Sequence, residues 1–137
     1  MQSIFSRIIE GEIPSYKVAE DSKHFAFLDI SPLKKGHVLV VPKQQIDYIF
    51  DLEDARYLDL WQFTKKVSHC IKKVIPCKRI GVAVIGFEVP HAHIHLIPMD
   101  NLEDINFNRN RLELSEKQFL ETSLLISSAF SSSQDYA

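Results

Sequence analysis

The 137-residue sequence contains little cysteine, little glycine and no large excess of charge of either sign. Its two cysteines, Cys70 and Cys77, do not have Cys-x-x-Cys spacing, so they predict reduced thiols rather than a disulfide framework or a zinc site. The 4 glycines and 6 prolines are too few for a collagen-like or low-complexity chain. A net charge of −2 provides no general attraction for nucleic acid, so a duplex partner is not expected.

The sequence also lacks a long apolar run. No window approaches the roughly 18 consecutive apolar residues of a membrane-spanning helix. A signal peptide has an apolar core where this sequence has the charged residues Arg7, Glu10 and Glu12. We therefore expect neither a signal peptide nor a membrane partner. We expect a cytoplasmic protein. The length is that of one domain, so we expect residues 1–130 to form a single domain and residues 131–137 to form a flexible polar tail.

Three segments space their apolar residues in the way that predicts a helix. The first begins after Ser3 as its N-cap and ends at Gly11. The second and longest covers residues 51–75. The third begins at Ser115, where Gln118 three residues later completes a capping box.

Five further segments predict strands. A polar turn at residues 21–23 separates the first two strands, and the β-branched run at residues 37–41 predicts the third. The last two are expected at residues 79–85 and 91–97, followed by a polar loop at residues 100–110. Together these elements predict an α+β domain, in which a mostly antiparallel sheet of about five strands packs against one long helix, with a C-terminal helix added.

Three of the six histidines lie in one heptapeptide, HAHIHLI at residues 91–97. Because side chains alternate along a strand, His91, His93 and His95 are expected on one face at intervals of about 7 Å. A purely structural role would be costly, because neighbouring buried imidazoles compete for partners and repel each other when protonated. The cluster therefore predicts a functional site.

Two kinds of chemistry use such a face. A His-x-His pair on a strand can supply two ligands to a zinc ion, although a metal site usually adds a carboxylate or thiolate, and the nearby acid is Glu88. Alternatively, one imidazole attacks a phosphorus atom while its neighbours donate hydrogen bonds to the phosphate oxygens. The spacing alone does not distinguish these two hypotheses.

The heptapeptide resembles the His-φ-His-φ-His-φ-φ signature, with φ apolar, of the histidine triad (HIT) family of nucleotide hydrolases and transferases. Three other segments resemble this family in the same order along the chain. They are residues 3–14, residues 27–32 (FLDISP) and residues 36–43 (GHVLVVPK). The resemblance implies a HIT-like fold and leaves residues 99–137 unmatched.

The resemblance implies catalytic roles for four histidines. His93 would attack the α-phosphorus of a purine nucleoside phosphoramidate or adenylate, and water would then release a nucleoside monophosphate from the nucleotidyl-histidine. His95 and His91 would hold the phosphate oxygens and assist the leaving group, and His37 would orient the nucleophile. No cofactor or metal is implied. The alternatives are a dinucleoside polyphosphate hydrolase and a nucleotide-binding protein with little turnover.

The resemblance also implies a substrate pocket. Asp29 would accept hydrogen bonds from the ribose hydroxyls, and Glu88 would lie beside the substrate, either bonded to a histidine or turned out to solvent. Apolar side chains would line the nucleoside site, namely Ile4, Phe5, Ile8, Phe27 and Ile30.

The sequence departs from the family pattern in two places. Ser3 and Ser6 stand where many members have a zinc-binding Cys-x-x-Cys motif, so a structural zinc is not expected. The loop at residues 84–90 is short, and Phe87 replaces a glutamine that often contacts phosphate, which favours the binding-protein alternative. Because the family usually pairs its sheets across a two-fold axis, we expect a homodimer.

Overall fold

The computed structural model describes residues 1–134, and its centre is one antiparallel sheet with the strand order β1-β2-β3-β5-β4. The strands are β1 (Lys17–Glu20), β2 (His24–Leu28), β3 (Val38–Pro42), β4 (Arg79–Ala83) and β5 (Ile94–Met99). The helices are α1 (Ile4–Ile9), α2 (Asp54–Val74) and α3 (Glu116–Gln134), with short 3-10 helices η1 (Ile49–Asp51) and η2 (Leu102–Ile105). The expected α+β class with five antiparallel strands is therefore confirmed.

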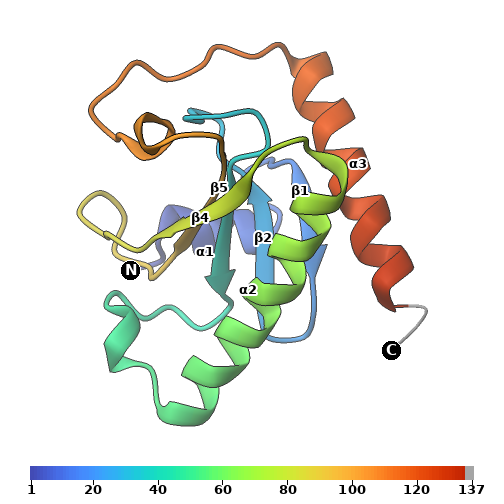
Figure 1. The fold of residues 1–137 in the computed structure, drawn as a ribbon. Helices are drawn as coiled ribbons and strands as arrows, with labels where there is room; N and C mark the ends of the chain where they lie inside the picture. The colour runs from blue at the N-terminus through green and yellow to red at the C-terminus, as the bar shows by residue number, and fades with distance from the viewer. Residues whose placement is uncertain (135–137) are drawn as a thin grey trace.

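The helices cover the sheet unequally. Figure 1 shows α2 crossing one face of the sheet, with α3 beside it and next to β1, while the short α1 lies behind the sheet. Within residues 1–134, no helix combines the length and the apolar composition needed to cross a lipid bilayer.

Alternation of side chains along β2 and β3 divides the core into two layers. The side chains facing α2 and α3 belong to the main core and include Ala26, Leu28, Val38 and Val40. The intervening side chains pack with Phe5 of α1 in a second cluster that contains Phe25, Phe27, Leu39 and Val41. The second cluster lies on the face of the sheet that carries the histidines, since the ring of Phe5 is 5.0 Å from that of His93.

Local signals in the sequence correctly locate the two helix starts that depend on capping. The Ser3 hydroxyl accepts a 3.0 Å hydrogen bond from the backbone N–H of Ser6 at the start of α1. At the start of α3, the Gln118 N–H donates to Ser115 Oγ at 3.1 Å and the Ser115 N–H donates to Gln118 Oε1 at 2.8 Å. Both predicted caps are confirmed.

The boundaries of three expected elements were wrong. The long helix begins at Asp54 rather than at residue 51, because residues 49–51 form η1 and Leu52 then takes an extended backbone. The expected loop at residues 100–110 contains η2, which is closed by a capping box between Asn101 and Asp104. Strand β5 begins at Ile94 rather than at residue 91 because the Ala92 N–H donates to the Ile46 carbonyl, outside the sheet ladder.

The expected tail overlaps the end of α3. Helix α3 continues to Gln134, so residues 131–134 are helical. Packing explains the extension, because the Phe130 ring lies 5.8 Å from that of Phe63 and anchors this end of α3 to α2. Residues 135–137 of the expected tail lie outside the described residues.

Candidate active site

The fold brings four histidines together on one face of the sheet. His37 immediately precedes β3, and His95 in β5 is register-paired with Leu39 of β3. The ring of His93 lies 5.1 Å from that of His95, and the rings of His37 and His95 are 5.2 Å apart. His37 and His91 are 0% exposed, while His93 is 7% and His95 is 8% exposed.

The backbone assigns the protons on the His37–His95 pair. The Leu33 N–H donates to His37 Nδ1 at 3.0 Å, so this nitrogen carries a lone pair. His37 Nε2 then carries the proton and donates to His95 Nδ1 at 2.9 Å. His95 is consequently protonated at Nε2, which makes no hydrogen bond within the described residues. This N–H is left for a ligand.

The backbone also assigns the proton on His93. Its Nδ1 lies 2.8 Å from the carbonyl oxygen of His91. Because a carbonyl oxygen only accepts hydrogen bonds, Nδ1 carries a proton, and in the neutral ring Nε2 then has the lone pair. A neutral imidazole with a free Nε2 is a competent nucleophile.

His91 differs from the other histidines because both of its nitrogens have partners in the protein. Its Nε2 donates to the Pro42 carbonyl at 2.8 Å, so Nδ1 accepts from the Ser3 hydroxyl at 2.7 Å. This geometry favours a role in which His91 holds the backbone of the heptapeptide, through the carbonyl that binds His93. It leaves His91 without a free nitrogen for the phosphate contact that the sequence led us to expect.

A small polar cluster occupies the position of the family's zinc motif. Gln45 Oε1 accepts from the Ser3 N–H at 2.8 Å and from the Ser6 hydroxyl at 2.8 Å. The Ser6 hydroxyl lies 3.4 Å from His91 Nδ1. Hydroxyls and an amide therefore hold α1 to the histidine loop at the positions where the family that the sequence resembles often has thiolates. Gln45 was missed in the sequence because its partners are about 40 residues away and no local pattern marks it.

Burial keeps His37, His91 and His95 neutral, because a charged imidazole loses its hydration inside the protein. Burial, with a smaller effect of His93 and Arg111, lowers the pKa of His95 to about 4. Burial, with smaller electrostatic effects of His95 and Arg111, lowers the pKa of His37 to about 3. Burial also lowers the pKa of His91. The assigned tautomers of these three rings therefore persist at neutral pH.

Acidification from pH 7 to pH 5 is expected to destabilise the fold by an amount on the order of 2 kcal/mol. In this range the histidines of the unfolded chain bind protons near their ordinary pKa, whereas folded His37 and His95, at about 3 and about 4, do not. Stability is thus lost as the pH falls. The raised pKa of Asp29 acts in the opposite direction and reduces the net effect.

Urea denaturation at pH 7 and pH 5 measures this difference. A His37→Asn variant, which cannot titrate at this position, should lose a large part of the pH dependence. A variant of the exposed His69, His69→Ala, should retain it. Equal stability of the wild type at the two pH values would contradict the assigned neutral state.

The candidate metal ligands near the triad already take part in hydrogen bonds within the protein. Ligand atoms of Asp29, His37 and His95 all lie within 4.8 Å of one another. However, the facing nitrogens of His37 and His95 already share a proton, and the other nitrogen of His37 accepts from the Leu33 N–H. A metal ion there would have to displace an internal hydrogen bond, so the hydrogen-bonding interpretation fits these residues better.

The apolar residues expected around a nucleoside fall into two groups. Phe5 and Phe27 are buried, with ring centroids 5.5 Å apart, and Phe5 contacts His93. Ile8 is half-buried on the same cluster, whereas Ile4 and Ile30 are exposed. The structure thus places Phe5 beside the triad with Phe27 packed against it, and the two exposed isoleucines at the surface.

The two expected carboxylates also differ in environment. The Asp29 side chain is 15% exposed, and its burial raises the pKa of the carboxyl. Its Oδ1 accepts from the Ser31 N–H at 2.8 Å, and its Oδ2 lies 3.6 Å from His37 Nε2. Glu88 is exposed and makes no hydrogen bond to a histidine in the described part of the chain. Of the two alternatives for Glu88, the structure favours the solvated charge.

Two residues near the triad were missed in the sequence. Phe107 lies edge-on to His95, with ring centroids 4.9 Å apart, and the Arg111 guanidinium carbon lies 5.4 Å from the centre of the Phe107 ring. Arg111 Nη1 donates to the Ser31 carbonyl at 2.7 Å. Both residues come from the segment between η2 and α3, which no pattern in the sequence linked to the histidines.

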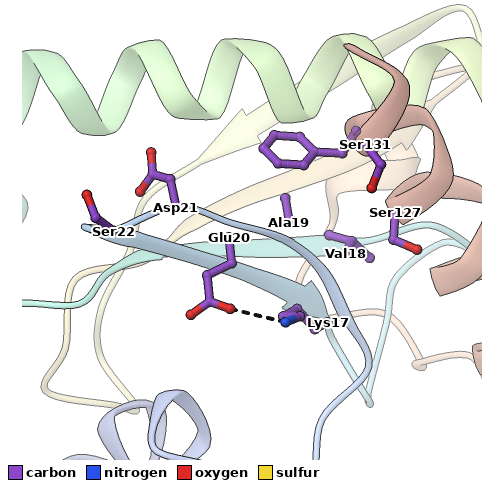
Figure 2. Close-up of a pocket in the computed structure, with 9 residues that line it drawn as sticks. Lys17, Val18, Ala19, Glu20, Asp21, Ser22, Ser127 and Ser131 are labelled. Carbon is purple, nitrogen blue, oxygen red and sulfur yellow. Dashed lines mark hydrogen bonds and ion pairs between the residues drawn. The ribbon is translucent and has the colours of Figure 1, made fainter. Parts of the chain in front are cut away.

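A separate hollow of about 660 Å³ lies between β1 and α3. Figure 2 shows it lined by residues 17–22 of the first hairpin, with Ser127 and Ser131 of α3 beside them. Its Glu20 carboxylate is paired with Lys43 at 2.7 Å and with Lys17 at 3.1 Å. None of the triad residues lines this hollow, so it is not part of the candidate active site.

Comparison with known proteins agrees with this geometry. The model of the HIT domain family matches residues 10–102. The chain therefore belongs to the HIT family, and the resemblance seen in the sequence is confirmed.

Individual relatives and one solved structure are similar to most of this chain. A Schizosaccharomyces pombe protein named adenosine 5'-monophosphoramidase is 38% identical over 105 residues, which cover 75% of this chain and 78% of that protein. A second protein of the same yeast, named bis(5'-nucleosyl)-tetraphosphatase (asymmetrical), is 32% identical over 128 residues, covering 90% of this chain and 67% of that one. The crystal structure of a HIT-like protein from Bartonella henselae superposes with a TM-score of 0.80 at 27% identity, covering 93% of this chain and 96% of that one.

Proposed function

We propose that this protein is a nucleotide hydrolase that cleaves at the α-phosphorus of a purine nucleoside phosphoramidate or adenylate through a nucleotidyl-His93 intermediate. The observation that carries the proposal is the hydrogen bond from His93 Nδ1 to the His91 carbonyl, which leaves Nε2 free beside the N–H of His95. The relatives named as a phosphoramidase and a tetraphosphatase support a hydrolase of nucleotides in general.

In the first step, His93 Nε2 forms a bond to the α-phosphorus as the bond to the leaving group breaks. The leaving amine takes its proton from solvent. The imidazole becomes positively charged during this step, and the His91 carbonyl stabilises that charge through Nδ1–H. In the second step, water attacks the phosphorus, releases the nucleoside monophosphate and restores neutral His93.

His95 contacts the phosphate oxygens, and His37 supports His95 from behind. His95 presents its Nε2–H to an oxygen that gains negative charge in the transition state. His37 touches no substrate in this scheme. It is a positioning residue, which holds His95 in the required tautomer through its own proton and the Leu33 N–H.

The function is tested with an adenosine phosphoramidate that carries a fluorescent amine, in the presence of a chelator. We expect release of the amine, together with an acid-quenched protein species that carries one nucleotidyl group. Faster cleavage of a diadenosine polyphosphate would favour the polyphosphate hydrolase, which the 90% coverage by the tetraphosphatase relative supports. Binding of adenosine monophosphate by calorimetry without turnover of either substrate would favour the binding-protein alternative.

We also propose a cytoplasmic homodimer formed through β4. The outer edge of β1 has α3 beside it, whereas β4 is the other end of the sheet and, among residues 1–134, pairs with β5 alone. Exposed apolar side chains follow this edge, with Val82 at 48%, Val84 at 38% and Ile85 at 45% exposure. An open strand edge with apolar side chains favours pairing with a second copy across a two-fold axis.

A Val82→Glu variant is expected to sediment as a monomer, because a charge at the two-fold interface faces its own copy. The matched control is Leu124→Glu. Leu124 is 63% exposed on α3, which packs beside β1 at the opposite end of the sheet from β4. The control should keep the dimer. Sedimentation velocity that gives a monomer for the wild type would overturn this proposal.

A further inference from the structure

The outer surfaces of α2 and α3 form a groove on the face of the sheet that is turned away from the triad. Figure 1 shows the two helices beside each other on this face, with α1 on the other side of the sheet. A hollow of about 660 Å³ lies between the end of α2 and the later turns of α3. We call it the α2–α3 groove, and its lining includes Lys73, Val74, Leu124, Leu125, Ser128 and Ala129.

Helix α3 carries apolar side chains on two sides, although one side alone packs against the rest of the protein. Phe119 and Ile126 are buried in the main core. On the outer side, Leu120, Leu124 and Leu125 are between 48% and 63% exposed. Single exposed leucines are common on soluble proteins, but three leucines within six residues of one helix form an apolar surface that another macromolecule can cover.

The outer surface of α2 beside this groove is strongly positive. Residues 60–87 contain six Lys and Arg residues and no Asp or Glu, in a chain whose net charge is −2. Lys65, Lys66, Lys72 and Lys73 are exposed, and none of them forms an ion pair in the part of the chain that the structure describes. Lys66 and Lys73 are two helical turns apart and therefore share one face of α2. Since Lys73 lines the groove, this row of charge borders it.

The helix dipole explains only part of this row. Cations in the last turn of a helix interact favourably with its C-terminal end, which applies to Lys72 and Lys73. Lys65 and Lys66 lie about two turns earlier, beyond the reach of that effect. Their positive potential attracts an anionic partner to the same surface.

The shape of the groove favours one class of anionic partner. The backbone of a nucleic acid duplex presents phosphates but no apolar surface for Leu124 and Leu125. A lipid bilayer is broad and does not enter a hollow between two helices, and Glu121 in the lining would face its anionic headgroups. A protein helix meets both requirements, because side chains of a third helix fit the groove between two neighbouring helices.

We propose that the α2–α3 groove is a docking site for an amphipathic helix of a partner protein, with leucines on one face and carboxylates beside them. The leucines of that helix would pack on Val74, Leu124 and Leu125, and its carboxylates would lie beside Lys66 and Lys73. Because the triad is on the other face of the sheet, the docked protein would keep its active site open. The inference goes beyond the proposed function and does not depend on it.

The probe is a synthetic helical peptide of about 20 residues, with leucines at alternating spacings of three and four and glutamates at the flanking positions. Fluorescence anisotropy measures its binding to the full chain. We expect saturable binding that is about 10-fold or more tighter than that of two control peptides. One control has lysine in place of glutamate, and the other has the same composition with its leucines spread around the helix. Absence of saturable binding up to about 1 mM of the acidic peptide would overturn the proposal.

Two variants test the groove itself. Leu124→Gln should weaken binding of the acidic peptide by about 10-fold, because it removes apolar surface from the contact. Lys73→Glu should weaken it by about 5- to 10-fold at low salt, because an attraction becomes a repulsion, and this loss should shrink at high salt.

The matched controls make the same changes away from the groove. Leu58→Gln alters a leucine that is 61% exposed near the other end of α2, and Arg7→Glu reverses a charge on α1. Both should bind the peptide as the wild type does. An unchanged urea midpoint in all four variants separates lost binding from lost folding. Equal losses in the groove variants and in their controls would show that the peptide binds elsewhere, which contradicts the proposal.

Three further results would assign the groove to a different occupant and so overturn the proposal. The first is tighter binding to vesicles that contain phosphatidylserine than to the acidic peptide, with this binding lost in Leu124→Gln. The second is binding to an RNA duplex that Lys73→Glu weakens and Leu124→Gln does not. The third is sedimentation of Leu124→Gln as a monomer when the wild type is a dimer, which would place a second copy of this chain in the groove.

Discussion

Replacement of His93 by alanine is expected to lower kcat for the phosphoramidate by about 10⁴-fold or more, because it removes the atom that would bond to phosphorus. The structure supports this size of effect through the single free lone pair at His93 Nε2. The ring nitrogens of His91 and His95 cannot act as the nucleophile in place of His93 Nε2. His91 has both nitrogens occupied, and His95 presents an N–H rather than a lone pair.

The loss is measured by amine release and by the yield of the nucleotidyl-protein species in acid-quenched samples. His69→Ala, in the exposed part of α2, is the control for removal of a histidine without removal of the nucleophile. Calorimetric binding of adenosine monophosphate and an unchanged urea midpoint show that the variant is folded. Wild-type turnover in His93→Ala would show that the reaction proceeds by direct attack of water.

Replacement of His95 by phenylalanine is expected to lower kcat by about 10²- to 10³-fold. Phenylalanine keeps the ring contacts with Phe107 and His93, which are 4.9 Å and 5.1 Å between centroids, but has no N–H to donate. The donor acts most strongly in the transition state, where the phosphate oxygens gain charge. The loss should therefore fall on kcat more than on KM.

A His95→Gln variant provides the matched comparison, because its longer side chain can place an amide N–H near the position of Nε2 and should recover part of the rate. His37→Asn should have a smaller effect than His95→Phe, since His37 reaches the substrate only through His95. If His95→Phe and His95→Gln had equal activity, the donor role of His95 would be wrong and its contribution would be packing alone.

Much of the architecture is specified by short-range patterns that the sequence displays directly. The Ser3 and Ser115 caps, the hairpin around residues 21–23 and the alternation in β2 and β3 each depend on residues only a few positions apart. Local hydrogen bonds and side-chain periodicity determine such features, so the α+β class could be predicted. The heptapeptide at residues 91–97 indicated the triad for the same reason.

Boundaries were predicted less well where distant contacts compete with local preference. Residues 91–93 have the alternation of a strand, but the Ala92 N–H bonds to the Ile46 carbonyl and β5 starts three residues later than residue 91. Helix α3 extends through residue 134, since Phe130 packs against Phe63 across 67 positions of the chain. Neither partner can be identified from the neighbouring sequence.

The residue types of the site could thus be predicted from the sequence, but the protonation and tautomer of each histidine depend on tertiary contacts. A histidine is a donor or an acceptor according to what its other nitrogen meets, and here the Leu33 N–H, the Pro42 carbonyl and the His91 carbonyl make that choice. The sequence also did not predict a cation near the triad, because Arg111 donates to the carbonyl of Ser31, which is 80 positions away in the chain. Sequence patterns record which groups are present, whereas protonation and charge balance depend on distances that only folding establishes.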